Sequence, residues 1–270
     1  MTRLAASAPV SLLYVPAHKP RAIAKARTLA CDMVILDLED AVPAGDKDAA
    51  RSIAADALAE GFEGKLVALR INPGERMTDD LAVLRAGTAD YVVVPKVSSP
   101  ADLPSIPPLP VLAMIETPAA ILGLATIAAD ARVAGLIAGL NDLAEELRLP
   151  GGVDRAAMSY GLQAIVMAAR AHGAWCFDGV CNAIDDADAS AAEAREAYRL
   201  GYDGKSLIHP GQIASCNAAW LPDPADVDDA RRMVAAAADG AERFDGRMIE
   251  AMHVAAARRL IARADLSARR

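Results

Sequence analysis

Short apolar segments recur along the chain, and most are followed by an alanine-rich stretch with the spacing of a helix. Inside these segments apolar residues run on without strict polar alternation, which is typical of parallel strands buried on both faces. The eight segments are residues 11–16, 33–39, 66–72, 91–97, 111–117, 133–139, 174–180 and 205–210. The pattern therefore predicts eight strands.

Helix signals lie between the predicted strands. Thr117 followed by Pro118 is typical of an N-cap and first helical position, and Gly201 closes a predicted helix over residues 186–200. Residues 98–110 carry too many prolines for a full helix. Eight strand–helix alternations predict a (β/α)8 TIM barrel, with an open doubly wound sheet as the weaker alternative. No GxGxxG or GxxxxGK[ST] motif follows a strand, which weakens that alternative further.

The last part of the chain departs from the strand–helix alternation. Helical patterns near residues 224–239 and 247–264 follow Trp220, with no strand-like segment between them. We therefore predict a barrel over residues 1–220 and a C-terminal helical tail over residues 221–270. The tail is too small for a separate domain, so it should pack on the barrel or on a neighbouring subunit.

Composition narrows the class of protein. Of the 270 residues, 54% are hydrophobic and only 4% are aromatic, and the formal net charge is -8. This acidic, aromatic-poor chain is a poor partner for nucleic acid. No apolar run is long enough to span a membrane, no signal peptide is evident, and the four cysteines lack CxxC spacing. We expect a cytoplasmic protein with reduced thiols.

Polar side chains follow the apolar runs where the strands should end. They are Asp37, Glu39 and Asp40, Arg70 and Asn72, Lys96, Glu116, Asn141 and Asp142, and Asp178. In (β/α)8 barrels the chemistry lies at this end of the strands. Carboxylates gathered around one arginine are costly unless a cation or substrate compensates them, and Mg²⁺ suits such ligands. A lone His209 is better explained as a strand-end histidine bonded to backbone.

Several motifs in order and spacing resemble one protein family. The motifs are LYVPAHKP, VILDLEDAV with Lys47 and Arg51 following, LRIN, VPKV, IETP, GLNDL and GYDGKSLIHPGQI. Together they resemble the citrate lyase β-subunit-like proteins of the 2-oxo-acid aldolase/citrate lyase superfamily over roughly residues 10–250. The resemblance implies a (β/α)8 barrel that assembles into a homotrimer or hexamer.

The resemblance also implies a chemistry. Glu116 and Asp142 would bind Mg²⁺ and act in catalysis. Arg70 would bind substrate and act in catalysis, and Glu116 would also belong to the substrate site. The implied reaction is carbon–carbon lyase cleavage, or formation, of a 3-hydroxyacyl thioester such as citryl-, malyl- or citramalyl-CoA. The products would be a 2-oxo acid and an acyl thioester of coenzyme A or an acyl carrier protein. Asp37 and Glu39 would orient Arg70 in the substrate site, while Lys96 would face substrate or form an ion pair at the rim.

One motif departs from the family pattern. The tail motif GxMID, whose aspartate is thought to reach a neighbouring subunit's site, reads GRMIE here, with Glu250 in place of aspartate. Glutamate keeps the carboxylate but adds a methylene, and a shift of about 1 Å in a reacting group can cost on the order of a hundredfold in rate. Glu250 is either the catalytic carboxylate for proton transfer at the thioester α-carbon or an ordinary surface residue.

Two alternative functions stay open at this stage. One is an aldolase that cleaves a free 4-hydroxy-2-oxo acid, and the other is a non-catalytic or assembly subunit of a citrate lyase complex. The tail segment and the LDLEDAV motif favour the thioester lyase over the aldolase. Intact Arg70, Glu116 and Asp142 argue against a non-catalytic role.

Overall fold

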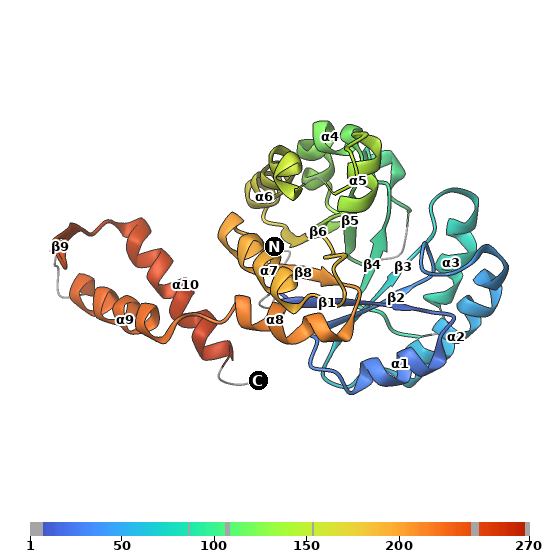
Figure 1. The fold of residues 1–270 in the computed structure, drawn as a ribbon, viewed down its shortest axis with the longest axis horizontal. Helices are drawn as coiled ribbons and strands as arrows, with labels where there is room; N and C mark the ends of the chain where they lie inside the picture. Colours follow the sequence, from blue (N-terminus) through green and yellow to red (C-terminus); the bar gives the residue numbers. More distant parts are fainter. Residues whose placement is uncertain (1–7, 86, 106–108, 153, 239–242, 268–270) are drawn as a thin grey trace. The chain divides into compact units, whose positions relative to one another are not determined.

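A closed barrel of eight parallel strands forms the main part of the molecule (Figure 1). The computed structural model describes residues 8–85, 87–105, 109–152, 154–238 and 243–267. The strands are β1 (Ser11–Pro16), β2 (Met33–Asp37), β3 (Leu66–Arg70), β4 (Tyr91–Val94), β5 (Val111–Ile115), β6 (Val133–Ala138), β7 (Trp175–Asp178) and β8 (Gly204–Leu207). They pair in sequence order and β1 pairs with β8, so the predicted (β/α)8 barrel is confirmed.

Helices surround the strands on the outside of the barrel (Figure 1). They are α1 (Pro20–Arg27), α2 (Lys47–Glu60), α3 (Met77–Val83), α4 (Pro118–Ala129), α5 (Leu140–Glu146), α6 (Ser159–His172), α7 (Ala187–Leu200) and α8 (Ile213–Ala219). The Thr117 hydroxyl accepts the Ala120 N–H at 3.0 Å, which confirms the predicted N-cap. In the proline-rich β4–β5 connection, the described residues form only a short 3-10 turn, Pro100–Asp102.

The barrel interior is apolar, and its side chains come from alternate strand positions. Members of this cluster are Leu12 and Tyr14 on β1, Met33 and Ile35 on β2, Ala68 on β3, and Leu112 and Met114 on β5, together with residues of the other strands. The next inward positions are Asp37, Arg70 and Glu116. The same alternation that fills the core therefore delivers charged side chains to the C-terminal mouth of the barrel.

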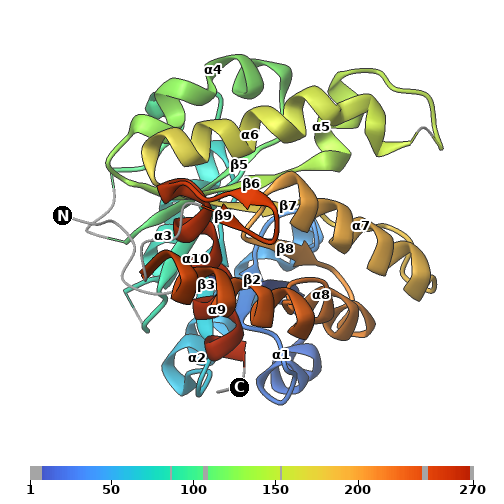
Figure 2. The same ribbon diagram turned by 90° about the vertical axis from the view of Figure 1, so that its left-hand side faces the viewer.

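The residues from Trp220 onward form a second compact unit. In it α9 (Pro224–Ala238) and α10 (Ala251–Ser267) lie side by side (Figures 1 and 2). A short hairpin pairs β9 (Arg243–Phe244) with β10 (Arg247–Met248) through a turn at Asp245 and Gly246, both with positive φ. The last helix therefore begins at Ala251, later than predicted, because the residues just before it form the hairpin around the Asp-Gly turn. No described helix is long and apolar enough to cross a membrane.

Candidate active site

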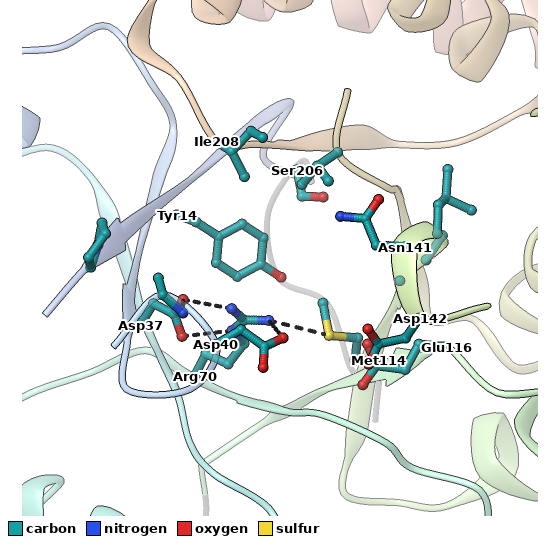
Figure 3. A pocket seen from close by; sticks show the side chains of 16 residues that line it. Tyr14, Asp37, Asp40, Arg70, Met114, Glu116, Asn141, Asp142, Ser206 and Ile208 are labelled. Carbon is teal, nitrogen blue, oxygen red and sulfur yellow. Dashed lines mark hydrogen bonds and ion pairs between the residues drawn. The ribbon is translucent and has the colours of Figure 1, made fainter. Parts of the chain in front are cut away.

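Arg70 is the central cation of the barrel mouth, and neighbouring strands hold it rigidly. Asp37 and Arg70 are register partners on β2 and β3, so their side chains meet directly. Nε and Nη2 of Arg70 donate to the two carboxylate oxygens of Asp37 at 2.8 and 2.6 Å, a bidentate pair. Nη1 lies 2.8 Å from Glu39 Oε2, and the guanidinium carbon lies 4.8 Å from the Tyr14 ring centroid. Arg70 is thus held in one position before any substrate arrives (Figure 3).

A buried polar network supports the loop that carries Glu39. The Lys47 ammonium donates to the carbonyls of Leu38 and Glu39 and to Asn72 Oδ1, each at 2.7 Å. Asn72 in turn donates through Nδ2 to Asp80 at 2.7 Å and to the Leu38 carbonyl at 2.8 Å. Two of the three Lys47 donors therefore fix the backbone at Leu38 and Glu39, and the third holds the Asn72 side chain.

A second group of residues lies across the mouth, at the ends of β4, β5 and β6. Glu116 Oε1 accepts the backbone N–H of Lys96 at 2.6 Å, and Lys96 takes a positive φ of 54° to present it. Glu116 also lies against Gly139, where an added Cβ would stand 2.5 Å from the carboxylate oxygen Oε2. Lys96 Nζ lies 3.1 Å from Asp142 Oδ2. Glycine at position 139 thus leaves the space that the Glu116 carboxylate occupies.

Burial and mutual repulsion raise the pKa values of two carboxylates at the barrel mouth. Burial raises the pKa of Glu116 to about 7, and the charges of Asp142 and Glu39 add to the rise, while the Lys96 N–H opposes it. Burial also raises the pKa of Glu39 to about 7, against the pull of Arg70. Without a further cation, these two groups take up protons near neutral pH. A bound cation would therefore stabilise the ionised forms of these two carboxylates.

Mg²⁺ fits this pair of carboxylates. Glu116 and Asp142 line the same pocket and would be the protein ligands. Among the described residues no three His, Cys, Asp or Glu side chains are grouped to hold a metal. Mg²⁺ commonly takes one or two carboxylates and completes its octahedron with water and substrate oxygens. In the structure the half-exposed Lys96 ammonium is the cation that pairs with Asp142, at the place where a bound metal would supply positive charge. The raised pKa of the buried Glu116 supports the same assignment as a metal ligand, because a bound cation would stabilise its ionised form.

One pocket of about 340 Å³ joins the two groups (Figure 3). Its lining includes Tyr14, Asp37, Asp40, Arg70, Met114, Glu116, Asn141, Asp142, Ser206 and Ile208. Glu39 and Lys96 are not part of this lining, but they form ion pairs with Arg70 and Asp142 respectively. The structure therefore brings Arg70, Glu116 and Asp142 together in one pocket, with Asp37, Glu39 and Lys96 paired to them. Tyr14 was missed, because within SLLYVP it resembles an ordinary core residue.

Other candidates lie outside the pocket. Glu250 belongs to the second unit, where it is exposed and its backbone N–H donates to His253 Nδ1 at 3.0 Å. Asp178 does not line the pocket, and it pairs instead with Arg155 and Lys205 at 2.9 and 2.6 Å. His209 Nδ1 accepts the Gly211 N–H at 3.1 Å, so the interpretation as a backbone-bonded histidine is confirmed.

Comparison with known proteins identifies relatives along nearly the whole chain. A (3S)-malyl-CoA thioesterase of Cereibacter sphaeroides is 40% identical over 268 residues, which cover 94% of each protein. A citrate lyase subunit beta-like protein of Deinococcus radiodurans is 34% identical, covering 93% of this chain and 95% of the relative. The structure is also similar to that of the protein CitE from Mycobacterium tuberculosis in complex with magnesium, acetoacetate and coenzyme A. That comparison gives a TM-score of 0.87 at 32% identity and covers 97% of this chain and 100% of the other.

The family match covers the barrel and its mouth. The HpcH/HpaI aldolase/citrate lyase family matches residues 10–210, a span that contains every residue of the pocket. The resemblance seen in the sequence motifs is therefore confirmed at the level of the family. The chain belongs to the HpcH/HpaI aldolase/citrate lyase family and is an enzyme of the carbon–carbon lyase class.

Proposed function

We propose that this protein is a Mg²⁺-dependent lyase that cleaves, or forms, the C2–C3 bond of a 3-hydroxyacyl-CoA thioester. Arg70 carries the proposal, because Asp37 fixes it bidentately in a pocket that also presents Glu116 and Asp142. The names of the relatives support a coenzyme A thioester as the substrate, since one is a (3S)-malyl-CoA thioesterase and the other is in complex with magnesium, acetoacetate and coenzyme A. A malyl-type substrate is therefore favoured over citryl-CoA.

The residues of the pocket divide the work by charge. Glu116 and Asp142 would hold Mg²⁺, which when bound supplies a Lewis acid for the 3-hydroxyl and the carboxylate beside it. Arg70 would bind the 2-oxo-acid half through its remaining N–H groups, as a fork that needs no reorganisation during the reaction. Asp37 and Glu39 would position Arg70, since both contact its guanidinium. Lys96 would balance the negative charge of Asp142 at the edge of the metal site.

Bond cleavage also requires two proton movements. The 3-hydroxyl must lose its proton, and the thioester enolate that receives the electron pair of the broken bond must gain one at its α-carbon. Glu250 is our candidate for the second proton transfer, at the α-carbon, because it is a carboxylic acid and stands at the aspartate position of the tail motif. Because it is exposed on the second unit, we propose that it serves the pocket of a neighbouring subunit in a homo-oligomer.

Hydrolysis of the thioester is the second candidate function. It is favoured by the relative named (3S)-malyl-CoA thioesterase, to which this chain is 40% identical. In that reaction water attacks the thioester carbonyl, and the products are free coenzyme A and malate. The same metal and arginine would bind the malyl group, so the pocket accommodates either reaction.

Product analysis separates the two functions. Malyl-CoA, citramalyl-CoA and citryl-CoA are incubated with the protein and Mg²⁺, and acetyl-CoA, 2-oxo acid and free thiol are measured together. The lyase predicts acetyl-CoA and 2-oxo acid in equal amounts without free thiol, while hydrolysis predicts thiol without 2-oxo acid. Glu116→Gln and Asp142→Asn should abolish either activity. Turnover of a free 4-hydroxy-2-oxo acid in place of the thioesters would instead indicate the aldolase, and no turnover at all would refute the proposal.

A further inference from the structure

Tyr14 brings a buried hydroxyl into the pocket without using it. Its side chain is buried on β1, with the ring against the Arg70 guanidinium. Among the described residues its hydroxyl has no hydrogen-bond partner. Figure 3 shows this hydroxyl directed toward the middle of the pocket, between Arg70 and Asn141. A buried phenol of this kind normally finds a partner, so its partner should be a bound molecule.

Tyr202 shows how the same fold treats a tyrosine that is purely structural. It is likewise buried, but its hydroxyl donates to the Leu162 carbonyl at 2.8 Å, and it is not part of the pocket lining. Of the two tyrosines, only Tyr14 lines the cavity. The two residues therefore differ in one respect that matters, the presence of a protein acceptor.

The surroundings of Tyr14 make it a neutral donor. Burial raises the pKa of its phenol far above the usual value, and the charge of Arg70 only partly opposes this. Nearby carboxylates are already engaged, Asp37 and Glu39 with Arg70 and Glu116 with the Lys96 N–H. A neutral donor suits an acceptor that is uncharged in the bound substrate and becomes negative as the reaction proceeds.

We propose that the Tyr14 hydroxyl donates a hydrogen bond to the thioester carbonyl oxygen of the substrate and strengthens it as that oxygen becomes an enolate. This inference rests on the proposed lyase function. The metal and Arg70 match the charged 2-oxo-acid half. The thioester carbonyl is then left for Tyr14, the neutral side-chain donor that lacks a protein partner among the described residues of the pocket lining. When the C2–C3 bond breaks, its electron pair passes into the thioester, and the new negative charge lies largely on that oxygen.

The variant Tyr14→Phe removes the hydroxyl and keeps the ring on Arg70. We expect its kcat for thioester cleavage to fall about 100- to 1,000-fold, as for loss of one donor to a developing oxyanion. Exchange of the acetyl-CoA methyl protons with deuterium should slow by a similar factor, while KM for the thioester changes little. The ligand-free melting midpoint should stay the same or rise, because an unpaired buried hydroxyl is removed.

Tyr202→Phe is the matched control. It should lower the melting midpoint by several degrees and leave kcat of the folded enzyme unchanged, since its hydroxyl has a backbone partner. If wild-type protein is active and Tyr14→Phe keeps full kcat and exchange, the Tyr14 inference alone is wrong. If wild type cleaves no thioester, the lyase function fails. A midpoint loss in ligand-free Tyr14→Phe as large as in Tyr202→Phe would reveal a structural partner and overturn the inference whatever the activity.

Discussion

At the residue scale, Glu116 couples metal binding to pH. Its pKa is raised to about 7 by burial, so near neutral pH a proton competes with Mg²⁺ for the same carboxylate. For one such proton, the apparent affinity for Mg²⁺ should rise about tenfold between pH 6 and pH 8. Calorimetric titration at several pH values measures this dependence. Flat affinity across the range would mean that Glu116 is not a metal ligand.

The same carboxylates shape the stability of the metal-free protein. Glu39 and Glu116 have folded pKa values of about 7, against an ordinary value of 4.5. Because the folded pKa is raised, the stability that the neutral forms contribute is present below about pH 4.5 and is lost as pH rises through 7. We expect the metal-free melting midpoint to fall across this window and Mg²⁺ to restore it at the alkaline end. Glu116→Gln should weaken both effects.

The variant Arg70→Lys tests whether catalysis needs the planar guanidinium of Arg70 or only its positive charge. Arg70→Lys keeps the charge but loses the double contact to Asp37, so we expect kcat/KM to fall about 100-fold or more. Steady-state kinetics with the best thioester measures the loss. Arg132 offers the control, because it grips Asp130 with two bonds of 2.9 Å outside the pocket lining. Arg132→Lys should leave kcat/KM unchanged, and an equal loss in both variants would contradict the role of Arg70.

At the element scale, the loop after β2 depends on Lys47 at the start of α2. Lys47→Met keeps the length of the side chain but removes the ammonium donor from the Glu39 carbonyl and from Asn72 Oδ1, while the Leu38 carbonyl keeps only its bond from Asn72. We expect a loss of about 1–3 kcal/mol in unfolding free energy and a clear fall in kcat/KM, because Glu39 loses its fixed position beside Arg70. Denaturant unfolding and kinetics on the same preparation measure both.

Lys65 provides the control for this loop. It donates to the carbonyls of Leu29 and Cys31 just before β3, at the opposite end of the barrel from the pocket. Lys65→Met should lower stability in the same way without changing the kinetics of the folded enzyme. If Lys47→Met also leaves kcat/KM intact, the network behind Glu39 is structural only.

The strands explain why most of this site could be predicted from the sequence. A buried parallel strand is a continuous apolar run, and a charge at its end stands out against that background, as Glu116 does after VLAMI. Tyr14 carries no such signal, since it lies inside an apolar run and only the closed barrel turns it toward the pocket. The Asp245–Gly246 turn carries a hairpin signal, but the two-residue strands beside it are too short to form a strand-like pattern in the sequence.

At the scale of the whole molecule, Glu250 raises the question of which subunit completes the pocket. The pocket residues all belong to the barrel unit, while Glu250 lies in the second unit, exposed and next to the start of α10. A carboxylate placed there is available to another copy of the chain, and closed homo-oligomers make every such contact repeat around the ring. We therefore expect a homo-oligomer in which the tail of one subunit serves its neighbour.

Hybrid oligomers test this arrangement without any structure of the assembly. Glu250→Gln and Glu116→Gln should each be nearly inactive alone. The first variant lacks the proton-transfer group, and the second lacks a metal ligand. Coexpressed in equal amounts, they should regain activity at roughly one site in four, because intact pocket and intact tail meet independently with even odds. Recovery requires the two residues to act from different chains. Two inactive variants that stay inactive together would place Glu250 in the pocket of its own chain, and a fully active Glu250→Gln would leave it a surface residue.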